Sequence, residues 1–297
     1  MSDDVPSSRR GLFRDLAKAA ARSDFAKAAA RRIPDVPGLE PELPMPAPRP
    51  ALLSDEELER YSRQLVLPEW TELAQVALRD ASVLIVGAGG LGSPVSLYLA
   101  GAGVGRIGLV DSDVVEISNL ARQPVHFTPD NGVPKVESAA AKLRFLNPDV
   151  LVEPYQVWLD SENAAGLVED QDLVIDCSDN FATRYAVNAA CCEAGINLIE
   201  GGVVGWSGLM MTIRPGLTSC YRCAFPVEPV DAPTCAEAGV LGPAVGVVGS
   251  LMALEALKLL GGAAATLRNE FLQIDLATLE LLRVNVMPRR ECADCPE

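Results

Sequence analysis

Short, uninterrupted runs of apolar residues alternate with helix-forming stretches through the middle of the chain. The clearest run, residues 82–87 (SVLIVG), is rich in β-branched residues and is typical of a strand that is buried on both faces. Further strands are predicted at 106–111, 151–155, 173–177 and 198–200. Helices are predicted from 54 to about 65, after 87 to about 102, and at 134–146 and 182–194. This alternation predicts an α/β fold with a mostly parallel sheet and helices on both of its faces.

The first fifty residues have a different composition. Residues 1–32 carry eight Arg or Lys against four Asp and are rich in alanine, which predicts a basic N-terminal segment with a marginal helix. Residues 33–52 contain seven prolines and predict a semi-rigid linker, because each Pro fixes φ and removes a hydrogen-bond donor. We therefore expect one folded domain over 53–297, which a capping-box pattern at Ser54 introduces.

Charge and hydropathy narrow the class of protein. The net charge is −15, and because residues 1–32 contribute +4, the remainder carries −19, which argues against nucleic-acid binding. The longest apolar stretches, near 84–110 and 240–254, are interrupted by Gly, Pro or charged residues, so we expect no membrane span. The start Ser8-Arg9-Arg10 superficially resembles a twin-arginine export signal, but charged residues interrupt the segment that follows. These features predict a cytoplasmic protein.

A glycine-rich loop joins the first predicted strand to its helix. Gly87, Gly89 and Gly92 form a G-x-G-x-x-G pattern that also contains Gly90, and such glycines let phosphate oxygens approach backbone N–H groups. Asp111 closes the next strand, at the position where a carboxylate accepts hydrogen bonds from ribose hydroxyls. The pattern predicts a bound adenine nucleotide and leaves NAD as plausible as ATP.

Polar and cationic residues after the second strand favour ATP. The chain presents in turn Asp113, Ser118, Asn119, Arg122, Gln123 and Lys135. A polyphosphate that must depart needs cations to neutralise its developing charge, whereas the pyrophosphate of a dinucleotide is commonly held by a helix dipole. Arg122 and Lys135 are therefore candidate phosphate ligands.

A carboxylate-containing loop follows the strand predicted at 173–177. Asp176, Asp179 and Asn180 lie at the edge of the sheet where open α/β folds bind ligands. Mg²⁺ prefers oxygen ligands, so a carboxylate at this edge suits a magnesium ion held against phosphates. We favour Asp179 as the ligand, because Asp176 has the alternative of capping the strand or the following helix.

Four of the eight cysteines form two C-x-x-C pairs, Cys220/Cys223 and Cys292/Cys295. The pairs are too far apart in sequence for one compact finger, but together they suit a tetrathiolate zinc site that staples the C-terminal tail. Two separate redox pairs are the alternative, although neither pair begins a helix after a βαβ strand. Of the other thiols, Cys177, Cys191 and Cys192 suit buried hydrophobic positions, and Cys235 lies in a predicted loop.

His126 is the only histidine, and no Ser-His or Cys-His catalytic arrangement can be assembled around it. One ATP-dependent reaction, the adenylation of a carboxylate, is compatible with this absence. The attacking carboxylate is already ionised at neutral pH, so the reaction needs positioning and charge neutralisation rather than a general base. We therefore expect a structural role for His126. The alternative to an ATP-dependent adenylating enzyme is an NAD-dependent dehydrogenase, although no acid/base pair for hydride transfer is identifiable. An inactive nucleotide-binding scaffold is the non-enzymatic alternative.

These motifs closely resemble the ThiF/MoeB/HesA family of adenylyltransferases, the bacterial relatives of ubiquitin-activating enzymes. The resemblance spans about residues 54–296. It rests on Arg60-Tyr-Ser-Arg63-Gln, Gly87-Ala-Gly-Gly90-Leu-Gly92, Asp111-x-Asp113, Ser118-Asn-Leu-Ala-Arg122-Gln, Pro134-Lys135, Asp176-Cys-Ser-Asp179-Asn, Cys220-Tyr-Arg-Cys223 and Cys292-Ala-Asp-Cys295.

The resemblance implies a homodimer of Rossmann-like domains that each bind Mg-ATP, with a zinc-stapled C-terminal extension. It implies Gly90 at the phosphates, Asp111 on the ribose, and Asp179 at the magnesium ion. Asn119, Arg122 and Lys135 would surround the phosphates. Arg63 would reach the ATP of the neighbouring subunit.

The same resemblance implies a reaction and its partners. The C-terminal Gly-Gly carboxylate of a ThiS/MoaD-like, ubiquitin-like sulfur carrier protein attacks the α-phosphate, which gives an acyl-adenylate and pyrophosphate. A sulfur donor then converts the adenylate to a thiocarboxylate, and because the sequence stops at Glu297 without a rhodanese-like segment, we expect a separate donor protein. Cys235 resembles a family cysteine in a Thr-Cys-x-x-Ala-Gly setting and is a candidate thiol for capturing the activated carrier.

Overall fold

The computed structural model describes residues 52–228 and 238–295. The expectations for residues 1–51 and for the loop that carries Cys235 lie outside the described residues. The chain divides into two compact units, Met1–Ser54 and Asp55–Glu297, and every helix and strand below belongs to the second unit.

The helices are α3 (Asp55–Arg60), α4 (Ser62–Leu65), α5 (Glu72–Asp80), α6 (Gly92–Ala102), α7 (Lys135–Leu146), α8 (Ala164–Val168), α9 (Phe181–Ala194), α10 (Tyr221–Ala224) and α12 (Gly242–Gly261), with 3-10 turns η1 (Ile117–Asn119) and η2 (Thr128–Asp130). The strands are β1 (Ser82–Val86), β2 (Arg106–Val110), β3 (Leu151–Tyr155), β4 (Leu173–Asp176), β5 (Asn197–Val204), β6 (Ser207–Ile213), β7 (Glu270–Asp275) and β8 (Glu280–Asn285).

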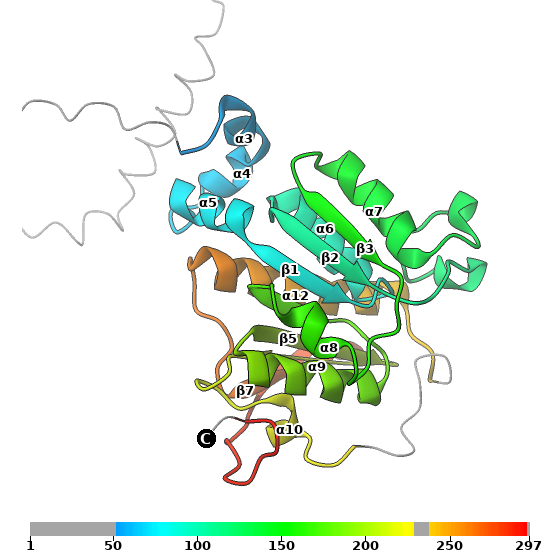
Figure 1. Cartoon of the computed structure of the whole chain (residues 1–297), viewed down its shortest axis with the longest axis vertical. Helices are drawn as coiled ribbons and strands as arrows, with labels where there is room; N and C mark the ends of the chain where they lie inside the picture. Colours follow the sequence, from blue (N-terminus) through cyan, green and yellow to red (C-terminus); the bar gives the residue numbers. More distant parts are fainter. Residues whose placement is uncertain (1–51, 229–237, 296–297) are drawn as a thin grey trace, which may run out of the picture. The chain divides into compact units, whose positions relative to one another are not determined.

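One eight-stranded sheet organises these elements, in the order β3-β2-β1-β4-β5-β6-β7-β8. Figure 1 labels β3, β2 and β1 as neighbouring strands. Strands β3 to β5 in this order pair in parallel, and β6, β7 and β8 are antiparallel additions at one edge. The expected mostly parallel, Rossmann-like sheet is confirmed. The chain proceeds from β1 toward β2 and β3 and later returns to place β4 on the other side of β1. The carboxyl ends of β1, β2 and β4 therefore flank a topological switch point, where folds of this kind bind ligands.

Helices cover both faces of the sheet because its central strands are apolar on both faces. In β1, Val83 and Ile85 join the core beneath α6, α7 and α12, whereas Leu84 and Val86 join the core beneath α8 and α9. Successive strand residues point to opposite faces, so an uninterrupted apolar run is what a strand covered on both sides requires.

Helix α12 corrects the interpretation of the apolar stretch near 240–254. The glycines there were treated as interruptions, but the helix runs through them for 20 residues. One of them, Gly249, lets α12 approach α6 closely, since a Cβ there would lie 2.5 Å from Pro94 Cγ. Among residues 52–228 and 238–295, α12 is the one helix long and apolar enough to cross a membrane. Its buried side packs against β5, β6 and α6, as a core helix does.

Two other expectations about elements needed adjustment. The helix predicted over 54–65 consists of α3 and α4, which meet at Tyr61. Tyr61 is buried, and its hydroxyl accepts a hydrogen bond of 2.9 Å from Asn147 Nδ2, so the break turns this ring inward. Strands β6 to β8 were not predicted. Most residues of β7 and β8 are exposed or half-buried, so these strands lack the continuous apolar run that marked the central ones.

Candidate functional site

A cavity of about 660 Å³ opens at the carboxyl ends of β1, β2 and β4. This volume lies within the range of small-ligand pockets in proteins. Residues predicted from the sequence line it from three separate segments: Gly87, Gly89, Gly90, Asp111, Asp113, Asn119, Arg122, Lys135, Asp179 and Asn180. The parallel sheet thus brings together side chains that are far apart in the sequence.

The glycine-rich loop turns too tightly for side chains at its two ends. Gly87 has φ +94°, and a Cβ there would lie 2.9 Å from the Cys177 carbonyl oxygen. A Cβ at Gly92 would lie 1.9 Å from the Gly87 carbonyl oxygen. Gly92 therefore allows the turn into α6 and is not among the cavity-lining residues, whereas Gly89 and Gly90 are.

Two side chains, the half-buried Asp111 and the buried His126, hold the peptide groups of Ala88 in this loop. The Ala88 N–H donates to Asp111 Oδ2 over 2.8 Å, and the Ala88 carbonyl lies 2.9 Å from His126 Nε2. Because a carbonyl oxygen can only accept, His126 Nε2 carries the proton, and Nδ1 accepts from the Ser138 hydroxyl at 2.8 Å. Burial lowers the pKa of His126, which keeps the ring neutral. His126 thus fixes the Ala88 carbonyl of the glycine-rich loop, which is a structural role.

Asp111 and Lys135 bring opposite charges to the β2 side of the cavity. Burial raises the pKa of Asp111, while Lys135 and backbone N–H groups of Asp113 and Ala88 act in the opposite direction. Lys135 Nζ lies 2.7 Å from Asp113 Oδ2, and the Lys135 side chain is only 9% exposed. Asp113 is therefore the ion-pair partner of Lys135 and keeps this ammonium group beside the cavity.

The segment around η1 presents Asn119 and Arg122. Asn119 is buried, and its Oδ1 accepts from the Glu116 N–H over 3.1 Å. Arg122 NH1 donates to the Ser118 carbonyl over 3.0 Å, which leaves other guanidinium N–H groups facing the cavity that Arg122 lines. The Ser118 hydroxyl donates to Glu116 Oε2 over 3.2 Å, and Ser118 is not among the cavity-lining residues.

The loop after β4 places Asp179 and Asn180 on the opposite wall. Asp179 is exposed to the cavity, and the described part of the chain offers it no hydrogen bond or ion pair, so its oxygens fit a hydrated cation. Asn180 Oδ1 accepts from the Thr183 N–H over 2.8 Å and is the N-cap of α9. Asp176 is fully buried, and its Oδ1 accepts from the Ser178 N–H over 2.8 Å. The preference for Asp179 as the cation ligand therefore agrees with burial.

Sequence analysis missed a buried ionic cluster behind this loop. Asp176 and Glu200 are opposite each other in the β4–β5 register, and both are fully buried. Arg184 NH1 donates to Glu200 Oε1, and Arg184 NH2 donates to the Ser178 carbonyl over 2.6 Å. Burial and the neighbouring Asp176 carboxylate raise the pKa of Glu200 well above its usual value. The available signal in the sequence was Arg184, which lies one helical turn after Asn180 on an otherwise apolar helical face.

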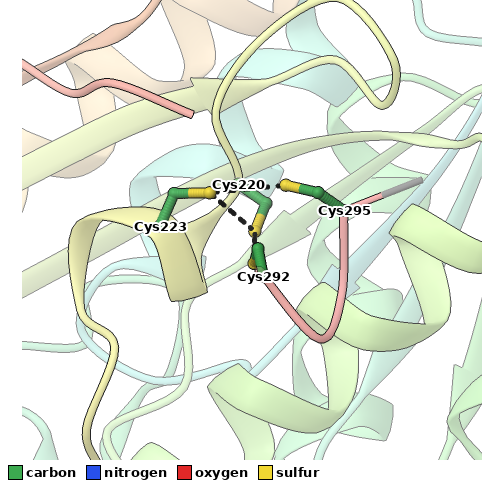
Figure 2. A group of neighbouring side chains, drawn as sticks. All are labelled: Cys220, Cys223, Cys292 and Cys295. Carbon is green, nitrogen blue, oxygen red and sulfur yellow. Dashed lines mark hydrogen bonds between the residues drawn. The ribbon is translucent and has the colours of Figure 1, made fainter. Parts of the chain in front are cut away.

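The four paired cysteines meet in one cluster, which Figure 2 shows with Cys220 and Cys223 at α10 and Cys292 and Cys295 on the C-terminal segment. Their sulfur atoms all lie within 4.8 Å of one another. The Cys220 sulfur is 3.8 Å from that of Cys223 and 3.5 Å from that of Cys292. A tetrahedral zinc ion with Zn–S bonds of about 2.3 Å places its sulfurs about 3.8 Å apart. The cluster could therefore hold zinc.

Polar contacts around the cluster orient its two segments. Asp294 Oδ2 accepts from Asn188 Nδ2 and from Arg222 Nε, each over 2.7 Å.

Hydrogen bonding from Cys192 lowers the pKa of Cys220 to about 4, whereas burial raises the pKa of Cys295. One thiolate is thus favoured by the protein alone, and a cation would favour ionisation of the others. Cys177, Cys191 and Cys192 are buried, as expected.

Among the described residues, three predicted nucleotide-site residues do not line the cavity: Gly92, Ser118 and Arg63. Arg63 lies exposed on α4. Cys235 lies outside the described residues. The cavity also contains residues that sequence analysis did not single out, among them Trp158, Arg184, Gly202, Tyr221 and Phe225.

The fold and this site define a Rossmann-like α/β nucleotide-binding protein with a cysteine cluster. The ThiF family model matches residues 61–296, and the chain belongs to that family.

Named relatives agree with this assignment. The chain is 48% identical over 256 residues to "Adenylyltransferase and sulfurtransferase MOCS3" of Sus scrofa, a match over 85% of this chain and 56% of that protein. It is 46% identical over 247 residues to "Sulfur carrier protein adenylyltransferase" of Thermus thermophilus, covering 81% and 91%. It is 41% identical to "Molybdopterin-synthase adenylyltransferase" of Escherichia coli, covering 82% and 99%. The chain thus spans about half the length of the animal relative and nearly all of the E. coli one.

Solved structures show the same fold. MccB of E. coli in complex with ATP superimposes with a TM-score of 0.72 at 26% identity, over 80% of this chain and 74% of that chain. PaaA superimposes with a TM-score of 0.68 at 22% identity, over 96% and 91%.

Proposed function

We propose that this chain is a Mg-ATP-dependent adenylyltransferase that activates the C-terminal Gly-Gly carboxylate of a ubiquitin-like sulfur carrier protein. One observation carries the proposal: a single cavity at the switch point combines a glycine-rich loop, the ribose-type acid Asp111, the cations Arg122 and Lys135, and the exposed carboxylate Asp179. The names of the Thermus thermophilus and E. coli relatives support the substrate class.

The residues divide the chemistry between them. The loop at Gly89 and Gly90 takes the phosphates on its N–H groups, and Asp111 accepts hydrogen bonds from the ribose. The carrier carboxylate attacks the α-phosphorus and displaces pyrophosphate, while Arg122 and Lys135 neutralise the negative charge that gathers on the departing oxygens. Asn119 contributes an amide to the same wall. No general base is needed, because the attacking carboxylate is already ionised.

Asp179 is the residue that would hold magnesium, with Asn180 beside it at the start of α9. When bound, the ion would supply positive charge next to the phosphates. The exposed position of Asp179, without a protein partner among the described residues, supports this role.

The four-cysteine cluster would hold one structural zinc ion. Four thiolates and no open ligand position are typical of structural rather than catalytic zinc. No cysteine of the cluster is among the cavity-lining residues, although Tyr221 of α10 is, and we assign zinc to stability and magnesium to the reaction.

Several wider features belong to the same proposal. The enzyme acts as a cytoplasmic homodimer in which Arg63 of each chain reaches the nucleotide of its partner, which is consistent with its exposed position away from its own cavity. A separate sulfur donor then converts the acyl-adenylate to a thiocarboxylate. Residues 53–297 form the catalytic domain, and residues 1–32 and 33–52 are an appended basic segment and linker.

Carrier-dependent exchange between ATP and labelled pyrophosphate tests the proposal. We expect Arg122→Ala, Lys135→Ala and Asp179→Ala each to reduce exchange by about a hundredfold or more, because each removes charge from the phosphates or their cation. Arg144→Ala is the matched control, since Arg144 lies on α7 with Lys135 but donates to the Val152 carbonyl outside the cavity. Wild-type exchange in the folded Ala variants would refute the site, and nicotinamide reduction without exchange would favour the dehydrogenase.

A further inference from the structure

Arg184 connects three segments of the chain at the back of the cavity. It lies on α9, donates through NH1 to Glu200 on β5, and donates through NH2 to the Ser178 carbonyl over 2.6 Å. Arg184 is 8% exposed and Glu200 is fully buried, so the hydrogen bond between them is shielded from water. We call this arrangement the Glu200–Arg184–Ser178 bridge.

The bridge acts on the peptide group that precedes Asp179. The Ser178 carbonyl belongs to the peptide bond that leads into Asp179, and the Ser178 N–H on its other side donates to Asp176 Oδ1 over 2.8 Å. Both peptide groups flanking Ser178 are therefore held by buried ionisable side chains. One residue further on, Asp179 is exposed and has no described protein partner of its own. The orientation of its carboxylate thus depends on the backbone behind it.

Space around the bridge is limited. A Cβ at Gly202 would lie 3.2 Å from both terminal nitrogens of Arg184, so the glycine leaves room for the guanidinium. A planar fork can satisfy the carboxylate of Glu200 and the carbonyl of Ser178 at the same time, which the single ammonium group of a lysine does less well. The site is therefore built for arginine.

We propose that Arg184 is a positioning residue for the cation-binding carboxylate Asp179, and that Glu200 acts through it. The inference rests on the proposed function of the cavity, because it assumes that Asp179 holds a divalent cation beside ATP. Residues that orient a metal ligand typically change metal affinity by about 10- to 100-fold when they are lost.

The test measures binding rather than turnover. ATP is titrated into the full-length, zinc-loaded protein by calorimetry, first in buffer without added Mg²⁺ or chelator and then over a series of MgCl₂ concentrations. For Arg184→Met we expect a Mg²⁺ requirement for tight ATP binding that rises by about 10- to 100-fold. Because Arg184 also lines the cavity, the effect of Mg²⁺ is measured against each variant's own metal-free ATP affinity. Asp179→Ala is the reference for complete loss of the Mg²⁺ effect.

Two further variants separate positioning from folding. Arg184→Met leaves Glu200 buried without its cation, which can prevent folding. Arg184→Lys keeps the positive charge, and the double variant Arg184→Met/Glu200→Met removes the buried ion pair altogether. Both should fold, as judged by thermal unfolding, and both should keep the raised Mg²⁺ requirement, since neither restores the fork that holds Ser178.

Arg106→Met is the matched control. Arg106 also joins a carboxylate and a carbonyl, those of Glu153 and Asp170. It is the first residue of β2, however, and the cavity lies at the other, carboxyl end of this strand. It should leave the Mg²⁺ requirement unchanged. A wild-type Mg²⁺ requirement in the folded Arg184 variants would overturn the inference alone. Failure of the wild type to bind ATP would overturn the proposed function, and the inference with it.

Discussion

Removing the C-terminal half of the cysteine cluster tests the zinc assignment most directly. The change is Cys292→Ser together with Cys295→Ser. In the wild type, a metal bound to all four thiolates joins positions 72 residues apart, as the Cys220–Cys292 and Cys223–Cys295 pairs show. Treated as a cross-link that closes a loop of this length, the metal restricts the unfolded chain by about 4 kcal/mol. We therefore expect the variant to lose about 4 kcal/mol of unfolding free energy.

The assay compares unfolding with and without metal. Wild-type protein from zinc-replete growth should contain one zinc per chain by elemental analysis. Its midpoint of thermal unfolding should lie roughly 8–16 °C above that of the double serine variant, from the size of the domain. A strong chelator should lower the wild-type midpoint toward the variant's and should leave the variant unchanged, because the variant has lost two of four ligands.

The direction of these effects distinguishes zinc from the alternatives. Without added Mg²⁺ and without a chelator, ATP affinity should be similar in the zinc-loaded wild type and the variant, because none of the four cysteines lines the cavity. An absence of bound metal, or a loss of unfolding free energy below about 1 kcal/mol, would refute a structural zinc ion that joins the two segments. If an oxidant raised the midpoint of thermal unfolding and zinc did not, the result would instead support two redox pairs.

Four further predictions test other parts of the model. Gly87→Ala should weaken ATP binding at least tenfold in calorimetry, because its Cβ would meet the Cys177 carbonyl oxygen at 2.9 Å in a backbone with φ +94°; unchanged affinity would show that the loop relaxes freely. Mixing Arg63→Ala chains with Asp179→Ala chains should restore part of the pyrophosphate exchange, and proven heterodimers that stay inactive would exclude a role for Arg63 across subunits. Deleting residues 1–52 should leave ATP binding intact, which a failure of the shortened protein to fold would contradict. Cys235→Ser should retain exchange and lose thiocarboxylate formation if the thiol captures the carrier, whereas full activity in both assays would assign it no catalytic part.

The elements around the glycine-rich loop could be predicted because their signals are local. The run 82–87 became β1 apart from its last residue, and residues 134–146 became α7 apart from the first residue, since apolar period and turn chemistry act over a few neighbours. Strands β7 and β8 escaped prediction because most of their residues are exposed or half-buried, so neither strand has an uninterrupted run of buried apolar residues. Gly249 of α12 looked like a break because its purpose, close packing on α6, involves a partner distant in sequence.

By itself, the sequence determined which chemical groups are available: the glycine-rich loop, the acids and cations that follow β2, and two pairs of thiols. Their spacing also determined the class of fold, because strand and helix periods are written locally along the chain. Only the tertiary structure decided which groups meet. It placed Asp113 on Lys135, brought four sulfurs within 4.8 Å, and buried Asp176 and Glu200 around Arg184. Such pairings depend on strand order and on exclusion of water, and these arise only when distant segments pack together.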